Sequence, residues 1–216
     1  MRIALKLMGV VLLALAVAPG WGQPASDAAL RAALSLTPDP VKGKAAFGDC
    51  AACHRKDASG RPLGPVPRLT GQHMSVIVKQ LLDIRSGLRI NPPMKLVLED
   101  PPLDLQTLVD VAAYVQSLPI TGNFSPGPGT GKERGKALFE QGCVGCHGSR
   151  AEGQAEHFRP ALAGQHYAYL LRELELIRDG GRGNSDAAMA ALLKPMGGAE
   201  LQALADYLSS MPPARQ

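Results

Sequence analysis

The chain has 216 residues, of which 45% are hydrophobic and only 4% aromatic, and its 23 basic and 19 acidic side chains give a formal net charge of +4. Two of the basic residues belong to an N-terminal segment that we expect to be removed, so the rest of the chain is nearly neutral. Aromatic residues do not alternate with clusters of basic residues. These properties exclude a typical nucleic-acid-binding protein.

Residues 1–22 have the pattern of a secretory signal peptide. Arg2 and Lys6 precede a short apolar run, and small residues follow it. We expect cleavage near Gly22 or Gln23, with Ala18 as the alternative. The run is shorter than the roughly 20 residues that a membrane-spanning helix needs, although a retained N-terminal anchor is an alternative that the sequence leaves open. Export predicts a periplasmic location, with membrane association as the alternative.

The chain matches itself at an offset of 93 residues. The matched positions include Cys50, Cys53 and His54 with Cys143, Cys146 and His147. The stretch PRLTGQH at residues 67–73 likewise matches PALAGQH at residues 160–166. A repeat of this length predicts two similar domains and not a solenoid. Segment 120–131 is rich in Pro and Gly and predicts a linker, so we place one domain at residues 38–119 and the other at residues 132–213.

Each repeat predicts three main helices, because apolar residues recur at helical spacing and glycines or prolines follow. The predicted helices are residues 42–50, 72–87 and 103–118 in the first repeat, and 132–143, 165–180 and 198–211 in the second. Residues 23–37 predict a short helix or a loose arm. No run alternates with a period of two over enough residues to predict a sheet. The fold class is therefore all-α.

The Cys-x-x-Cys-His motifs are the attachment signature of c-type haem. Two thiols add to the two vinyl groups of one porphyrin, a helical turn presents both sulfurs along one edge, and the adjacent histidine reaches the iron. We predict two covalent haems c, held by Cys50 and Cys53 and by Cys143 and Cys146, with His54 and His147 as iron ligands. The alternatives are a zinc site, which leaves both histidines unexplained, and a thioredoxin-type pair, which lacks its βαβ context.

Each iron needs a sixth ligand or an open face. Met94 and Met189 correspond to within two residues in the repeat register, so we predict His–Met ligation in both domains. Met94 lies in a proline-rich segment that we expect to be a loop. Met196 is the alternative in the second domain. His73 and His166 also recur, which leaves bis-histidine ligation as a further alternative. Because each directly follows a Gly-Gln pair at the start of a helix, we expect these histidines to border the haem or to cap the helix.

With these motifs the chain resembles the dihaem cytochrome c4 family, in which two class I cytochrome c domains are joined in tandem. The resemblance implies two small helical domains, each folded around a covalent haem c. It also implies that the carbonyls of Pro67 and Pro160 accept the ring N–H of the two proximal histidines. Leu69 and Leu162 would pack on the porphyrins.

The resemblance also implies an aromatic contact and a distal methionine ligand in each domain. Phe47 would contact Tyr114, and Phe139 would contact Tyr207. Met94 and its counterpart Met189 would be the distal ligands, although the stretch around Met94 is richer in proline than the family pattern.

The resemblance also implies a function. We expect a periplasmic electron carrier, not an enzyme, that takes electrons from a quinol-oxidising complex or a dehydrogenase and passes them to a terminal oxidase. The alternatives are a haem c subunit fixed to a dehydrogenase complex, and a dihaem peroxidase-type enzyme, which would need one iron without a strong distal ligand. The even charge balance predicts only weak electrostatic steering of partners, stronger at the first domain.

Overall fold

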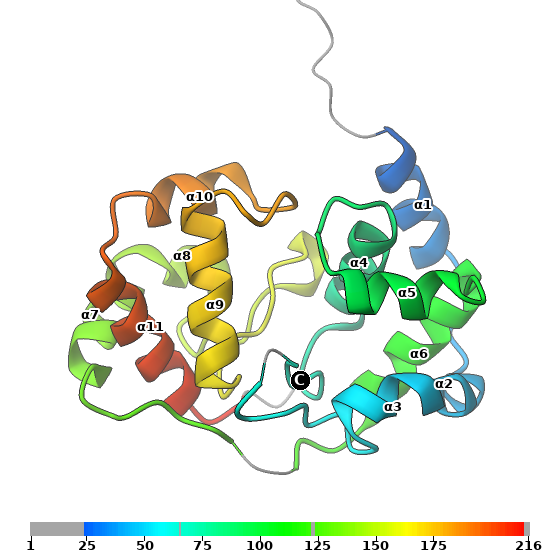
Figure 1. The fold of residues 1–216 in the computed structure, drawn as a ribbon, viewed down its shortest axis with the longest axis horizontal. Coiled ribbons are helices and arrows are strands. Elements are labelled where there is room, and N and C mark those ends of the chain that lie inside the picture. The colour runs from blue at the N-terminus through cyan, green and yellow to red at the C-terminus, as the bar shows by residue number, and fades with distance from the viewer. Residues whose placement is uncertain (1–23, 65, 122–123, 214–216) are drawn as a thin grey trace, which may run out of the picture.

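The computed structural model describes residues 24–64, 66–121 and 124–213, so the predicted signal peptide lies outside the described residues. These residues form helices joined by loops, and they contain two isolated β-bridges but no strand. In Figure 1 the first domain lies on the right and the second on the left. No helix in the described ranges combines the length and the apolar character that a membrane crossing requires. The all-α prediction is confirmed.

Every predicted helix is present, and the one predicted at residues 42–50 is divided into two. The helices of the first domain are α1 (Pro24–Leu34), α2 (Pro40–Ala46), α3 (Gly48–His54), α4 (Met74–Arg85), α5 (Pro92–Glu99) and α6 (Leu105–Ser117). Those of the second are α7 (Lys132–Gly142), α8 (Val144–His147), the 3-10 turn η1 (Ala155–His157), α9 (Tyr167–Arg178), α10 (Ala187–Leu193) and α11 (Gly198–Ser210). The possible arm before the first domain is helix α1, whose Leu30 and Ala33 are buried in the first core.

Helix α5 was not expected, because its stretch begins with two prolines. Pro92 and Pro93 occupy the first turn, where backbone N–H groups have no acceptor inside the helix, so the missing N–H costs nothing. The side chain of Asn91 caps this turn and accepts the N–H of Met94 at 3.4 Å. The prediction of a loop at Met94 is therefore wrong: Met94 lies on a helix, as does Met189 on α10.

Each domain is organised around a close crossing of two helices, α2 with α6 in the first domain and α7 with α11 in the second. A Cβ atom on Gly43 of α2 would lie 1.9 Å from the carbonyl oxygen of Asp110 on α6. A Cβ atom on Gly135 of α7 would lie 2.0 Å from the carbonyl oxygen of Ala203 on α11. Only glycine permits this approach in either domain.

Aromatic pairs close the same crossings. The rings of Phe47 and Tyr114 lie 5.5 Å apart between centroids, and those of Phe139 and Tyr207 lie 5.8 Å apart, both in tilted geometry. Tilted pairs at this distance are favourable beyond the area that they bury. Both contacts that the family resemblance implies are confirmed.

The domains meet through contacts that repeat with the same offset as the sequence. The side-chain amide of Gln72 accepts the N–H of Ala161 at 2.9 Å and donates to its carbonyl at 3.1 Å. Gln165 makes the same two bonds with Arg68, at 2.9 and 2.8 Å. Because each residue of one pair lies 93 positions from its counterpart in the other, the interface is close to a twofold, self-complementary arrangement.

Candidate haem sites

In the first domain the Cys-x-x-Cys-His residues lie on helix α3, and in the second domain they lie on helix α8 and its N-cap residue Cys143. In the second domain the N–H groups of Cys146 and His147 both donate to the carbonyl of Cys143, so the motif forms one helical turn. None of the four cysteines forms a disulfide, and Cys53 and Cys146 are exposed. This local geometry presents two thiols and an imidazole from a single turn, which suits a haem edge and its iron.

The histidines of the motifs are held by carbonyl oxygens. Nδ1 of His54 lies 3.1 Å from the carbonyl oxygen of Pro67, and Nδ1 of His147 lies 3.0 Å from that of Pro160. A carbonyl oxygen can only accept, so Nδ1 carries the proton and Nε2 is the atom available to a metal. These are the contacts that the family resemblance implies, and they are confirmed.

Burial sets the protonation states in both motifs. It lowers the pKa of His54 and His147 below the usual value, while the bonds to the proline carbonyls act in the opposite direction. Both imidazoles are therefore neutral at neutral pH, which is the form that binds iron. Burial also raises the pKa of the Cys143 thiol to about 11 and, together with Asp49, raises that of Cys50.

Each methionine predicted as a distal ligand packs against the core of its own domain. Met94 is half-buried and packs against the first core together with Cys50 and Leu69. Met189 packs against the second core, which contains Cys143, but Met196 packs there as well. The assignment of Met94 and Met189 to the irons stays a prediction.

His73 and His166 have another role. They occupy the N-cap positions of α4 and α9, but their side chains make no capping bond. Instead Nε2 of His73 donates to the carbonyl of Glu152, and Nε2 of His166 to that of Ser59, each at 2.8 Å and each across the domain interface. Because these nitrogens are engaged, the structure gives no support to bis-histidine ligation.

The sequence showed that these histidines are equivalent, but not that they join the two domains. The Gly-Gln-His triplets recur at equal positions, but nothing local shows that their partners lie in the other domain. His157, which has no histidine counterpart in the first domain, is exposed.

The residues present fit a haem in each domain. The thiols are unpaired, the imidazole tautomers are set, and a half-buried methionine lies beside each core. Haem also has two carboxylates, and near the interface Arg68 has two buried N–H nitrogens, Nε and Nη1, without a partner. Burial lowers the pKa of Arg68 to about 10, so it stays a cation at neutral pH and suits an acidic group.

The zinc alternative gains no support. Within the described ranges, no three His, Cys, Asp or Glu side chains come together as a site for a metal ion. Cys50 packs against the first core and Cys143 belongs to the second, so the two cysteine pairs lie in different domains. A shared tetrahedral site would need all four thiols together.

Comparison with known proteins gives matches over most of the chain. A family model described as cytochrome c matches residues 40–119 and 132–212. A cytochrome c4 of Pseudomonas aeruginosa is 30% identical over 80% of this chain and 89% of its own length. A thiosulfate dehydrogenase electron acceptor of Stutzerimonas stutzeri is 34% identical over 75% of this chain and 78% of its own.

The fold has a solved counterpart as well. The crystal structure of reduced recombinant cytochrome c4 from Pseudomonas stutzeri aligns with a TM-score of 0.72 at 30% identity. The alignment covers 82% of this chain and all of the other.

Proposed function

Because this chain belongs to the cytochrome c family, as a dihaem member of the cytochrome c4 group, we propose that it is a periplasmic shuttle that passes electrons between respiratory enzymes and catalyses no reaction itself. It is an electron-transfer cytochrome with two covalent haems c, one at each Cys-x-x-Cys-His motif. The predicted signal peptide supports the periplasmic location. The proposed donor is a quinol-oxidising complex or a dehydrogenase, and the proposed acceptor is a terminal oxidase.

Bound haem supplies reversible one-electron exchange between Fe(III) and Fe(II). The chain's own residues attach it, hold the iron and limit water. We assign attachment to Cys50, Cys53, Cys143 and Cys146, and iron ligation to His54, Met94, His147 and Met189. The carbonyls of Pro67 and Pro160 orient the imidazoles, so that little rearrangement accompanies a change of redox state.

One observation supports a carrier over an enzyme: both domains hold the proximal histidine identically. The two Nδ1-to-carbonyl contacts differ by only 0.1 Å, from 3.1 to 3.0 Å. A peroxidase-type protein requires one iron with an open face, whereas here both domains place a methionine beside the haem-binding core.

The experiment is to record the weak near-infrared Met–Fe(III) charge-transfer band of the oxidised protein. We expect Met94→Ala and Met189→Ala each to remove about half of the band, because each would take the sulfur ligand from one of two irons. Met196→Ala is the matched control and should leave the band unchanged. If Met196→Ala removes the band in place of Met189→Ala, the ligand of the second domain is misassigned. If neither Met94→Ala nor Met189→Ala changes it, a haem with an open face, and with it an enzyme, becomes the better explanation.

A second candidate function is supported by one relative. The protein of Stutzerimonas stutzeri is named a thiosulfate dehydrogenase electron acceptor, which favours a dehydrogenase as the donor or as a permanent partner of this chain. Purification from native periplasm and membranes separates the two possibilities. A stoichiometric dehydrogenase that co-purifies indicates a subunit, and a lone soluble protein indicates a shuttle.

We also place the main docking surface on the first domain. Arg55 adopts φ 67° and ψ 162°, a conformation that is almost exclusive to glycine, and its counterpart Gly148 is a glycine. Arg61 donates to the carbonyl of Ala52 at 2.9 Å and so lies over the haem-attachment segment. Leu63 is 98% exposed beside them.

This surface suits a redox protein with an acidic contact area around an apolar centre. Arg55, Arg61 and Leu63 line one surface groove. The counterparts of the three residues in the second domain are Gly148, Gln154 and Glu156, which supply no positive charge. Charge complementarity of this kind speeds the encounter of redox partners.

A further inference from the structure

A buried cluster of charged residues joins the two domains and takes no part in the haem sites described above. Glu173 on α9 accepts Nη2 of Arg89 at 3.0 Å and Nη1 of Arg182 at 2.7 Å. Arg89 belongs to the first domain, and Arg182 to the second. The side chains of Glu173 and Arg89 are only 8% and 11% exposed. One carboxylate therefore neutralises guanidinium groups from both domains, away from bulk water.

The cluster follows the internal repeat, with one chemical difference. Gln80 on α4 corresponds to Glu173, and Arg89 corresponds to Arg182. The Oε1 atom of Gln80 accepts Nη1 of Arg89 and Nη2 of Arg182, both at 3.0 Å. Gln80 and Glu173 thus each bind both arginines, but of these two side chains only Glu173 has a negative charge.

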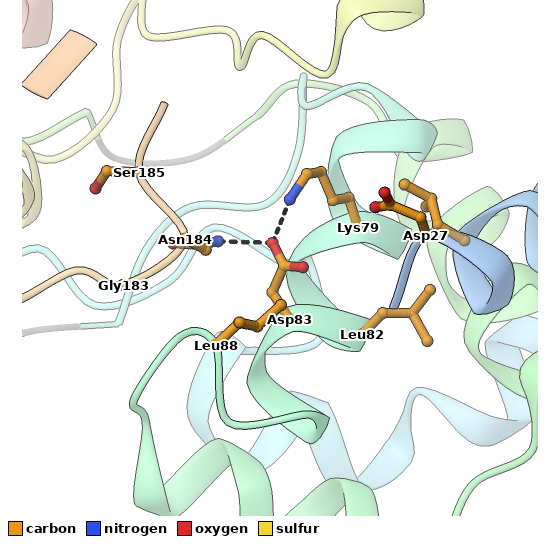
Figure 2. Close-up of a pocket in the computed structure, with 9 residues that line it drawn as sticks. Asp27, Lys79, Leu82, Asp83, Leu88, Gly183, Asn184 and Ser185 are labelled. Carbon is orange, nitrogen blue, oxygen red and sulfur yellow. Dashed lines mark hydrogen bonds and ion pairs between the residues drawn. The ribbon is translucent and has the colours of Figure 1, made fainter. Parts of the chain in front are cut away.

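The neighbouring acid is occupied elsewhere. Asp83 accepts Nζ of Lys79 at 2.5 Å and Nδ2 of Asn184 at 2.7 Å, and Figure 2 shows both side chains directed at it. No ion pair in the described part of the chain joins Asp83 to Arg89 or Arg182. Asp83 still acts on Arg182 electrostatically from a greater distance, but among the described residues Glu173 is the carboxylate in direct contact with both arginines.

Glu173 is ionised in this setting. Burial acts to raise the pKa of its carboxyl, but Arg182 and Arg89 outweigh that effect and hold it below the usual value. Arg172, which contacts the other carboxylate oxygen at 2.5 Å, acts in the same direction. A buried carboxylate with several cationic donors is strongly bound, and removing it leaves those cations uncompensated.

We propose that Glu173 is a positioning residue, whose carboxylate locks the two domains in one relative orientation and thereby sets the path for electron transfer between their haems. The lock stands on the contacts alone, whereas its role in electron transfer rests on the proposed function. The Oε1 atom of Gln80, in the first domain, accepts from the same two arginines as Glu173 but has no charge. The lock therefore depends on one negative charge between the arginines and not on which domain supplies it.

The test is a charge-relocation series in the full holoprotein. Glu173→Gln removes the charge, and Gln80→Glu combined with Glu173→Gln moves it to the other domain. Glu175→Gln, the same change two residues further along α9, is the control. Domain opening is measured first by small-angle X-ray scattering. It is measured second by the increase over the wild-type rate of chymotrypsin cleavage after Phe124, which is 42% exposed and whose ring lies 5.0 Å from the Arg68 guanidinium in the closed protein.

We expect Glu173→Gln to increase the maximum dimension and to speed cleavage by about tenfold, because cleavage follows the population of the open form. The double variant should return both values to those of the wild type, and Glu175→Gln should change neither. If Glu173→Gln leaves scattering and cleavage unchanged, there is no lock. If the double variant is as open as Glu173→Gln, the charge is not the cause and the proposal is overturned.

Electron transfer is measured in the same variants, as the rate at which an electron injected by pulse radiolysis equilibrates between the two haems. We expect this rate to fall in Glu173→Gln and to recover in the double variant. Opening without a change in this rate would refute the positioning role while leaving the lock intact. The near-infrared methionine band reports the proposed carrier function separately, since none of these substitutions touches an iron ligand.

Discussion

In both domains a carboxylate on the last helix accepts the N-cap N–H of an earlier helix, α2 or α7, but the two carboxylates stand at different positions of the repeat. In the first domain Asp110 of α6 accepts the N–H of Asp39, the N-cap residue of α2, at 2.8 Å. In the second domain Asp206 of α11 accepts the N–H of Gly131, the N-cap residue of α7, also at 2.8 Å. By the repeat offset, Asp206 corresponds to Ala113 and not to Asp110.

This difference shows which parts of the repeat can shift. A buried N–H at the start of a helix needs an acceptor, but any position on the facing helix that reaches it will serve. The carboxylate has moved by almost one helical turn between the domains. The interdomain Gln72 and Gln165 bonds have kept the offset of 93 residues, because there a fixed backbone atom has to meet its partner. The glycines of the close crossings, Gly43 and Gly135, differ by 92 residues, so the helix that carries them has shifted by one residue against the helix that it crosses.

The strongest test of this comparison is to fill the two glycine crossings. We expect Gly43→Ala and Gly135→Ala each to destabilise the holoprotein by about 3 kcal/mol, because the new methyl group would overlap a carbonyl oxygen of the facing helix. Chemical denaturation followed by circular dichroism measures the change.

The controls for this test are glycines of the haem-attachment helices. A Cβ on Gly48 or Gly145 meets no atom within 4 Å. Gly48→Ala and Gly145→Ala should therefore leave stability nearly unchanged. Equal losses in both domains would confirm that the crossings are equivalent, and a loss in one domain alone would show that they are not.

The next test compares the two carboxylates. We expect Asp206→Ala to cost about 2 kcal/mol, since it leaves the backbone N–H groups of Gly129 and Gly131 without their charged acceptor. Asp110→Ala should cost about 1 kcal/mol, because only one of its donors is backbone and the other, Gln106, also donates to a carbonyl. Urea unfolding measures both. The reverse order would contradict the view that the carboxylates differ in how many backbone donors they satisfy.

The smallest expected effect concerns the residue after each motif. Arg55→Gly should stabilise the protein by about 1 kcal/mol, because it gives the first domain the glycine that the second has at Gly148. The same substitution should slow electron exchange with an acidic redox protein at low salt, measured by stopped flow. Arg150→Gln in the second domain is the control and should leave that rate unchanged. If Arg55→Gly leaves the rate unchanged, partners do not dock at this surface.

Much of the fold and of the haem sites could be predicted from residues that lie near one another in the chain. Helical spacing located α4, α6, α7, α9 and α11, and the motif spacing located both pairs of thiols. The helix around Met94 could not be predicted, because Pro92 and Pro93 are as common in loops as in a first helical turn. The bonds of His73 and His166 could not be predicted either, since each joins residues about 80 or more positions apart.

By itself, the sequence determined that the chain is a duplicated, helical, dihaem protein, because helix formation and haem attachment depend on residues within one or two helical turns. Only the tertiary structure decided which residues of one domain meet the other. The pairing of Gln72 with Ala161, and the sharing of Glu173 by Arg89 and Arg182, arise when two folded domains dock. Contacts of that kind depend on shape and charge across a surface, for which the order of residues along the chain provides no local signal.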